Sequence, residues 1–107
     1  MTLAKKHCVP CEGGMPHFER AQVDEYMPKI KADWSTDGAK ITREFRFKDF
    51  TETMEFVNRV AALAQAEDHH PNMAVSYSKV VIDLWTHAAR GLTENDFILA
   101  AKIDELL

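Results

Sequence analysis

The 107-residue chain has the composition of one compact globular domain, because 46% of its residues are hydrophobic, 28% are charged and only four each are Gly and Pro. Thirteen Lys and Arg against seventeen Asp and Glu give a formal net charge of −4, which argues against direct binding of nucleic acid. The longest apolar runs, 60–64 and 97–101, are far shorter than the roughly 20 residues that cross a bilayer. Residues 1–17 lack the apolar segment of a secretory signal, so we expect a cytoplasmic protein that does not engage membranes and keeps its cysteines as thiols.

The chain is expected to begin with an irregular arm and a short helix. Residues 1–17 contain two Pro and two Gly and show no periodicity, so we assign them to an N-terminal arm before a single domain of residues 18–107. Apolar residues at helical spacing follow from Phe18. Pro28 has no backbone N–H to donate and should end or kink this helix near Met27.

A hairpin and a long helix are predicted next. The turn signal Thr-Asp-Gly at 36–38 precedes the run 41–47, in which apolar and polar residues largely alternate as on a strand. Asp49, followed three residues later by Glu, has the form of a helix start, and apolar residues then recur every three to four positions. Pro71 disfavours helical geometry at the residue before it, so this helix should end just before or at 69–70.

The remaining residues predict a second hairpin and a final helix. Residues 79–85 are rich in β-branched side chains and follow a turn near 77–78, which is typical of a strand. Gly91 breaks the chain, and Thr93 with an Asp three residues later predicts the start of a C-terminal helix. The order α-β-β-α-β-β-α, with helices and hairpins segregated, predicts an α+β fold: a four-stranded antiparallel sheet with helices packed on one face.

Three histidines, His69, His70 and His87, follow the ends of predicted elements and could meet in the fold. Histidine side chains have an unperturbed pKa near 6.5, so one can accept a proton while another donates one, as an elimination or hydration requires. Asp68 could orient an imidazole. The alternatives are surface or capping histidines, and a zinc site, which the spacing disfavours because adjacent residues project in different directions.

A separate cluster near the N-terminus contains His7, Cys8, Cys11 and His17. Its Cys-x-x-Cys pair could hold a metal such as zinc, or cycle as a redox pair. A second Cys pair is missing, and a thioredoxin-like motif would lie between a strand and a helix rather than in an N-terminal arm. A role outside catalysis is therefore the favoured interpretation of this cluster.

Asp96 and several aromatic residues permit both a structural and a functional interpretation. An acidic residue at the third helical position after Thr93 stabilises the helix start by capping. Aromatic side chains can stack on a flat heterocycle, but at strand spacing they belong more often to a core or an interface. The aromatic candidates are Trp34, Phe45, Phe47, Tyr77 and Trp85.

One closely spaced set of residues occupies the second half of the chain. His-His-Pro at 69–71 is followed by Tyr77, Thr86-His87, Gly-Leu-Thr at 91–93 and Asp96. Together with Phe-Arg-Phe-Lys-Asp-Phe at 45–50, this spacing resembles that of the pterin-4a-carbinolamine dehydratase family, and the likeness extends more loosely from Trp34 to the C-terminus. The fold of that family agrees with the order of elements predicted above.

The resemblance implies a lyase that removes water from 4a-hydroxytetrahydropterin, the carbinolamine left by aromatic amino-acid hydroxylases. The product would be a quinonoid dihydropterin that can be reduced again, in the recycling of tetrahydrobiopterin. No metal or organic cofactor is implied. The implied partners are the pterin substrate, a hydroxylase that acts before this protein, and further copies of the chain in a homodimer or homotetramer.

The resemblance also assigns roles to individual residues. His69 and His70 would form the principal acid–base pair, and His87 would complete the pocket, with acid and base interchangeable among the three. Asp68 would orient an imidazole and favour its protonated form, and Asp96 and Tyr77 would support the site. The residues expected to line the pterin are Pro71, Thr86, Ala88 and Ala89.

Two positions depart from the family pattern. Gln65 stands where the family usually has a charged residue, often Glu, and a glutamine can form hydrogen bonds but carries no charge. Met73 replaces an aromatic residue found in some members, so affinity or rate could be reduced. The alternative function is that of a catalytically weak member that acts as a protein-binding, dimerisation or assembly module, as some relatives of this fold do.

Overall fold

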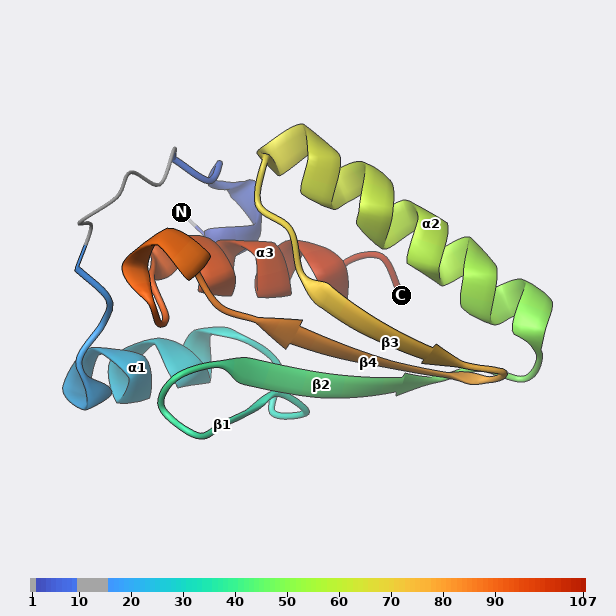
Figure 1. Ribbon diagram of the computed structural model, residues 1–107, viewed down its shortest axis with the longest axis horizontal. Helices are drawn as coiled ribbons and strands as arrows, with labels where there is room; N and C mark the ends of the chain where they lie inside the picture. Colours follow the sequence, from blue (N-terminus) through green and yellow to red (C-terminus); the bar gives the residue numbers. More distant parts are fainter. Residues whose placement is uncertain (1, 10–15) are drawn as a thin grey trace.

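A computed structural model describes residues 2–9 and 16–107, so Cys11 lies outside the described residues. The helices and strands follow one another in the predicted order (Figure 1). The short 3-10 helices are η1 (Leu3–Lys5), η2 (Met27–Lys29) and η3 (His87–Ala89). The remaining elements are α1 (Arg20–Tyr26), β1 (Ser35–Thr36), β2 (Ile41–Arg46), α2 (Phe50–Glu67), β3 (Asn72–Ser76), β4 (Lys79–Leu84) and α3 (Glu94–Asp104).

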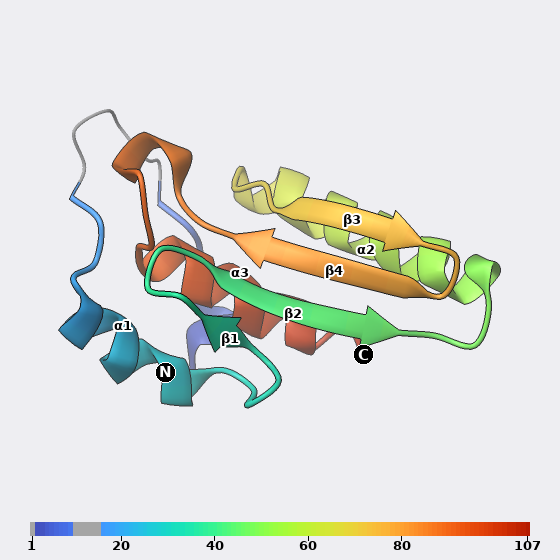
Figure 2. The same ribbon diagram turned by 60° about the horizontal axis from the view of Figure 1, so that its bottom comes forward.

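The four strands form one antiparallel sheet in the order β1-β2-β4-β3. Figure 2 shows this sheet in front of α2 and α3, which lie behind it on the same side. The predicted α+β class and the four-stranded antiparallel sheet are therefore confirmed. The hairpins join β1 to β2 and β3 to β4, while the long helix α2 connects the two hairpins across the back of the sheet.

The core lies between this sheet and the helices, as the alternation of apolar residues predicts. Ile41 pairs with Leu84 and Phe45 with Val80 across β2 and β4, and all four side chains are buried. Side chains from α2 and α3 close the other side of the core. The buried side chains of these two helices include Phe56, Val60, Ala64, Phe97, Leu99, Ala100 and Ile103.

Local capping accounts for the positions of the helix starts. The Asp49 side chain accepts a hydrogen bond from the backbone N–H of Glu52 at 2.8 Å, which fixes the first turn of α2. The predicted capping box of Thr93 and Asp96 is present at the start of α3. At the other end of α2, Asp68 adopts a left-handed conformation with φ 52°, which turns the chain away from the helix axis.

Residues 2–9, which we call the N-terminal strap, run along α3. Leu3 is buried in the core, and the Lys102 ammonium donates a hydrogen bond to the Ala4 carbonyl at 2.8 Å. The Lys6 ammonium lies 2.7 Å from the Glu94 carboxylate. The strap therefore contributes to the packing of the domain. The boundary at residue 18 stays a prediction, because residues 10–15 are not among those described.

Candidate active site

Two chain segments meet at one end of the sheet and bring the three histidines together. His69 and His70 follow the C-terminal end of α2, and His87 comes shortly after β4. Because β3 and β4 are antiparallel neighbours, the start of β3 lies beside the end of β4, where Asn72 pairs with Asp83. The tertiary structure thus joins residues that lie far apart in the sequence.

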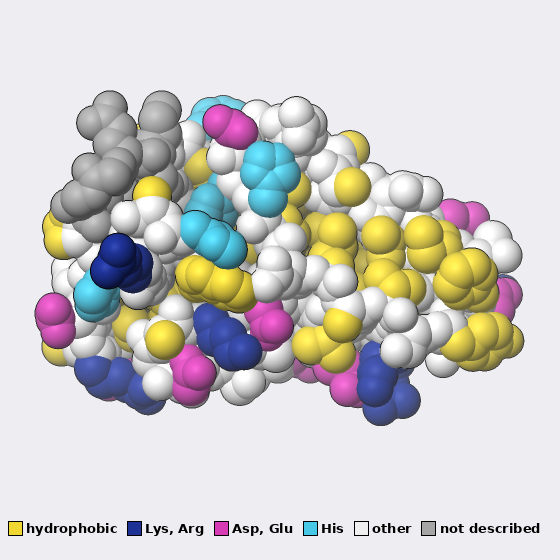
Figure 3. Space-filling model, in the orientation of Figure 1, with side chains coloured by type: hydrophobic (Ala, Val, Ile, Leu, Met, Phe, Trp, Pro, Cys, Tyr) yellow, Lys and Arg dark blue, Asp and Glu magenta, His cyan; other side chains and the backbone are white. Residues whose placement is uncertain are grey.

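The histidines line a cavity of about 370 Å³, which we call the histidine cavity. Figure 3 shows histidine side chains close together on one face of the molecule. The other predicted site residues that line it are Asp68, Pro71, Thr86 and Ala88, and they are joined by Asn72 and Trp85. Asn72 was not predicted, although its position directly after His-His-Pro was a signal that could have identified it.

His69 is held by a buried hydrogen bond to Asp96. Its Nε2–H donates to Asp96 Oδ1 at 2.7 Å, and the exposed fraction of the His69 residue is only 8%. This bond assigns the proton to Nε2 and leaves the lone pair of Nδ1 as the acceptor in the neutral imidazole. A buried carboxylate therefore fixes which nitrogen of His69 can take up a further proton.

Asp96 is itself fixed by a network of hydrogen bonds. Its Oδ2 accepts from the Thr86 hydroxyl and from the backbone N–H of Thr93, both at 2.9 Å. Because the Thr86 hydroxyl donates to Asp96, the Thr93 hydroxyl 2.8 Å away must donate to Thr86. Asp96 thus caps α3 and orients His69 at the same time, so both interpretations of this residue apply.

His70 and His87 are exposed and have different partners. The Nε2–H of His70 donates to Gln65 Oε1 at 3.1 Å, so the residue that departs from the family pattern contacts a predicted catalytic histidine. The ring of His87 stacks on that of Trp85, with the centroids 4.5 Å apart and the planes at 24°. The cavity therefore holds one buried, oriented imidazole and two imidazoles that water reaches.

Other predicted site residues lie elsewhere or lack the expected contact. Tyr77 is 68% exposed in the turn between β3 and β4, at the end of β4 away from the histidine cavity. Ala89 is buried, and its carbonyl accepts a hydrogen bond from His17 Nδ1 at 3.1 Å rather than facing the cavity. Among the described residues, Asp68 makes no hydrogen bond to an imidazole, and Asp96 supplies that contact instead.

The aromatic candidates divide between the core and the cavity. Trp34 and Phe45 are buried in the core, and the Trp34 indole donates to the Asp104 carboxylate at 2.9 Å. Phe47 packs at the margin of the core against Phe56. Trp85, which lies one residue beyond the last residue of β4, is the aromatic candidate that lines the histidine cavity.

The N-terminal cysteine cluster has no geometry suited to a metal within the described part of the chain. Burial, and after it the negative charge of Glu67, raise the pKa of the Cys8 thiol to about 12, so it stays protonated. The thiol lies 3.6 Å from the Asn95 carbonyl and donates to it. Within residues 2–9 and 16–107, no group of three or more His, Cys, Asp and Glu side chains is placed to hold a metal ion.

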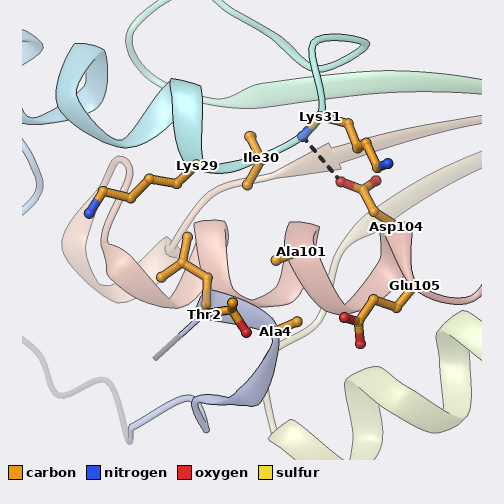
Figure 4. A pocket seen from close by; sticks show the side chains of 9 residues that line it. Thr2, Ala4, Lys29, Ile30, Lys31, Ala101, Asp104 and Glu105 are labelled. Atoms are coloured by element: carbon orange, nitrogen blue, oxygen red, sulfur yellow. Dashed lines mark hydrogen bonds between the residues drawn. The ribbon is translucent and has the colours of Figure 1, made fainter.

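A larger cavity of about 540 Å³ lies between η1, η2 and α3, and Figure 4 shows the side chains around it. The Asp104 carboxylate at its edge accepts hydrogen bonds from Trp34, Arg43 and the backbone N–H of Lys31. This carboxylate is thus committed to the fold, and no histidine is among the described residues that line the cavity. The histidine cavity is the better candidate for proton chemistry.

The fold and the site together define a class: an α+β domain in which three imidazoles line one cavity and a buried carboxylate behind it holds one of them, an arrangement suited to general acid–base catalysis. The sequence model described as pterin 4 alpha carbinolamine dehydratase matches residues 16–106, so the chain belongs to this family. No helix of the described residues is long and apolar enough to cross a membrane.

Relatives and solved structures agree with this assignment. A Nitrosospira multiformis protein whose name assigns it provisionally as a pterin-4-alpha-carbinolamine dehydratase is 47% identical over 104 residues. The match covers 97% of this chain and 91% of the relative. A Rickettsia bellii protein with the same provisional name is 42% identical over 106 residues, covering 98% and 94%.

Two solved structures share the fold. A transcriptional coactivator/pterin dehydratase from Brucella melitensis superposes with a TM-score of 0.78 and 33% identity, covering 84% of this chain and 97% of that one. A pterin dehydratase-like protein identified as a RuBisCO assembly factor in the alpha-carboxysome has a TM-score of 0.57 and 27% identity, covering 68% and 84%. The fold is thus shared by proteins whose descriptions name roles other than dehydration.

Proposed function

We propose that this chain removes water from a 4a-hydroxytetrahydropterin by histidine acid–base catalysis. The observation that carries this proposal is the buried hydrogen bond from His69 to Asp96, because it orients an imidazole that lines one cavity together with His70 and His87. Membership of the pterin dehydratase family supports the choice of substrate. The fold alone would not, because one fold serves many functions.

The reaction needs one group to take up a proton and another to supply one. A base removes the proton from N5 of the pterin, the N5 lone pair forms a double bond to C4a, and the C4a–O bond breaks. An acid protonates the departing hydroxyl, so the products are a quinonoid dihydropterin and one water molecule. Each proton transfer can contribute about 10²–10⁴ to the rate. The reaction as written uses proton transfers alone and needs no metal or redox cofactor.

The environments of the histidines favour a division of these roles. Nδ1 of His69 is the acceptor that Asp96 leaves available, so we assign the base to His69. His70 and His87 are exposed and can exchange protons with water, and we assign the acid to this pair. Pro71, Thr86 and Ala88 would line the pterin ring, together with Asn72 and Trp85.

The wider role follows from the same proposal. The carbinolamine would come from an aromatic amino-acid hydroxylase, and the quinonoid product would return to tetrahydrobiopterin by reduction. We place this reaction in the cytoplasm and in a homo-oligomer of the chain. The family name supports the substrate, and the oligomer is supported by the edge of β3 that no other described strand covers.

The test is the rate at which the carbinolamine decays, followed by ultraviolet absorbance after a phenylalanine hydroxylase has generated it. The wild-type protein should accelerate the decay, and His69→Ala and His70→Ala should each abolish most of that acceleration. His7→Ala is the matched control, because His7 is an exposed histidine outside the cavity and should retain full activity. Equal activity in all three variants would refute the histidine mechanism.

The second candidate is a protein-binding or assembly module. The likeness to a pterin dehydratase-like RuBisCO assembly factor favours it. The same assay separates the two candidates: natively folded wild-type protein that leaves the decay unchanged would support the module. Gln65→Glu, which adds the charge usual in the family, would then show whether the missing charge at this position accounts for the lack of dehydratase activity.

A further inference from the structure

A second hollow of about 490 Å³ adjoins the histidine cavity. Trp85 and His87, whose rings stack on each other, line both spaces, so the two spaces meet at this pair. The rest of this side hollow is lined by Asp37, Ala39 and Lys40 from the end of β1 and the turn before β2, and by Arg90 from the residue after η3. The mechanism proposed above makes no use of these four residues.

Two cationic side chains, Lys40 and Arg90, line the side hollow, although the chain as a whole has a net charge of −4. The Asp37 carboxylate accepts backbone hydrogen bonds from Ala39 at 2.8 Å and Lys40 at 3.0 Å. These bonds lower the pKa of the Asp37 carboxyl and commit its charge to stabilising the turn. The negative charge in the hollow is therefore already engaged by the backbone of the protein.

The two cationic groups of the hollow, those of Lys40 and Arg90, have few polar partners among the described residues. The Lys40 ammonium lies 4.0 Å from Asp83 Oδ2, which is too far for a hydrogen bond, and Asp83 Oδ1 already accepts one from Thr42 at 2.6 Å. The Arg90 guanidinium has no ion pair or hydrogen bond within residues 2–9 and 16–107. An anion in the hollow would give Arg90 an ionic partner and would give Lys40 a closer one than Asp83.

The backbone at Arg90 adds an independent observation. Arg90 has φ 58°, in the left-handed region, where a side chain other than Gly or Asn typically costs about 1 kcal/mol. Bonds between Thr86 and Gly91, at 2.9 and 3.3 Å, close the loop around η3 and hold this conformation. An arginine kept where glycine would fit more easily is consistent with a use for its side chain.

We propose that the side hollow binds a negatively charged substituent of the pterin, a carboxylate or a phosphate, while the ring reacts in the histidine cavity. The substituent would extend past the stacked rings of Trp85 and His87, which line both spaces, and pair with Lys40 and Arg90. A guanidinium and an ammonium are the cations that bind such groups in proteins. This inference rests on the proposed function, and it predicts that a carbinolamine with an anionic side chain binds more tightly than one with a neutral side chain such as that of biopterin.

The test compares three carbinolamines that share the ring: one with a methyl group at C6, one with a carboxylated side chain and one with a phosphorylated side chain. In the wild-type protein the KM of an anionic substrate should lie at least ~10-fold below that of the methyl compound, which corresponds to about 1.4 kcal/mol. The KM values of the carboxylated and the phosphorylated substrates show whether the hollow binds a carboxylate, a phosphate or both.

The variant Lys40→Gln/Arg90→Gln should bring the ratio of those KM values close to one and remove its dependence on salt concentration. Arg46→Gln, an exposed arginine at the far end of β2, is the matched control and should keep the wild-type ratio. Equal KM values for all three substrates in the wild-type protein would overturn the subsite and leave the proposed function standing.

A binding measurement distinguishes failure of the subsite from failure of the proposed function. If none of the carbinolamines is dehydrated, calorimetric titration with the stable oxidised pterins still measures binding. Tighter binding of an anionic pterin than of the methyl pterin, lost in the double variant, would support the subsite without catalysis. Equal affinities, or no binding by protein with a native circular dichroism spectrum, would overturn it.

Discussion

The Nε2 atom of His69 lies 2.7 Å from Oδ1 of Asp96, although 27 residues separate the two in the chain. This contact joins the segment after α2 to the first turn of α3, so it couples the stability of a helix start to the orientation of an imidazole. Both residues are buried, and the contact is thus screened little by water or salt.

Asp96→Asn should lower the dehydration rate by about 100-fold, because an amide in this place can present its NH2 to His69 and disturb the tautomer. The matched control is Asp104→Asn, a second nearly buried carboxylate on α3, which binds Trp34 and Arg43. Both variants should lose about 1–3 kcal/mol of unfolding free energy, measured in urea. The proposed role of Asp96 is wrong if both lose activity to the same extent.

Gln65→Glu should extend activity to higher pH. The new carboxylate would stand where the Gln65 amide oxygen now lies, 3.1 Å from His70 Nε2, and would favour the protonated imidazole. The pH–rate profile should therefore keep its plateau over roughly one further pH unit on the alkaline side. Gln65→Leu, which removes the hydrogen bond without adding charge, is the comparison, and superimposable profiles for all three proteins would contradict the expectation.

The N-terminal strap should detach in acid. Burial alone would raise the pKa of the Glu67 carboxyl, but hydrogen bonds from Cys8 N–H and His7, with the charge of Lys102, outweigh it and hold the pKa below 4.5. Since the pKa is lower in the folded chain, this carboxylate stabilises the fold above pH ~4.5 and loses the effect as the pH falls through the lowered pKa.

Glu67→Gln removes that titration, so its melting temperature should fall less than that of the wild-type protein between pH 6 and pH 3. Differential scanning calorimetry measures the difference. Glu55→Gln, an exposed glutamate of the same helix, is the control and should follow the wild type. Parallel curves for Glu67→Gln and the wild type would exclude Glu67 as the acid-sensitive anchor of the strap.

Cys8 should be a poor nucleophile in the folded protein. A thiol with a pKa of about 12 holds roughly a thousandfold less thiolate at pH 8 than one with the ordinary value of 9.0. In a Cys11→Ser background, alkylation by iodoacetamide should be slow in buffer and fast in denaturing urea. Rapid alkylation of the folded protein would contradict the buried, protonated thiol and reopen the redox interpretation.

The outer edge of β3 should pair with another copy of the chain. Within the described residues β3 is paired on one side alone, by β4, and Val75 and Tyr77 near this edge are 40% and 68% exposed. Sedimentation velocity should give the mass of a dimer or tetramer, and Val75→Lys should shift it toward the monomer, because a lysine on an edge strand discourages pairing. A wild-type monomer at every concentration would contradict this.

The sequence by itself determined the elements, because their signals act between near neighbours. The contact of Asp49 with the N–H three residues later starts α2, and the capping box of Thr93 starts α3 at the expected place. The alternation of apolar residues assigned the buried faces of β2 and β4. The positions of three histidines after the ends of predicted elements indicated that they could meet, and all three line one cavity.

Only the tertiary structure decided which residues meet. Asp68 is adjacent to His69 in the chain, yet Asp96 holds the imidazole, because the left-handed turn at Asp68 directs the chain toward α3. The stacking of Trp85 on His87 and the nearness of Lys40 and Arg90 depend likewise on how the loops cross the end of the sheet. Such contacts follow from strand register and helix packing over the whole domain, which no local run of residues encodes.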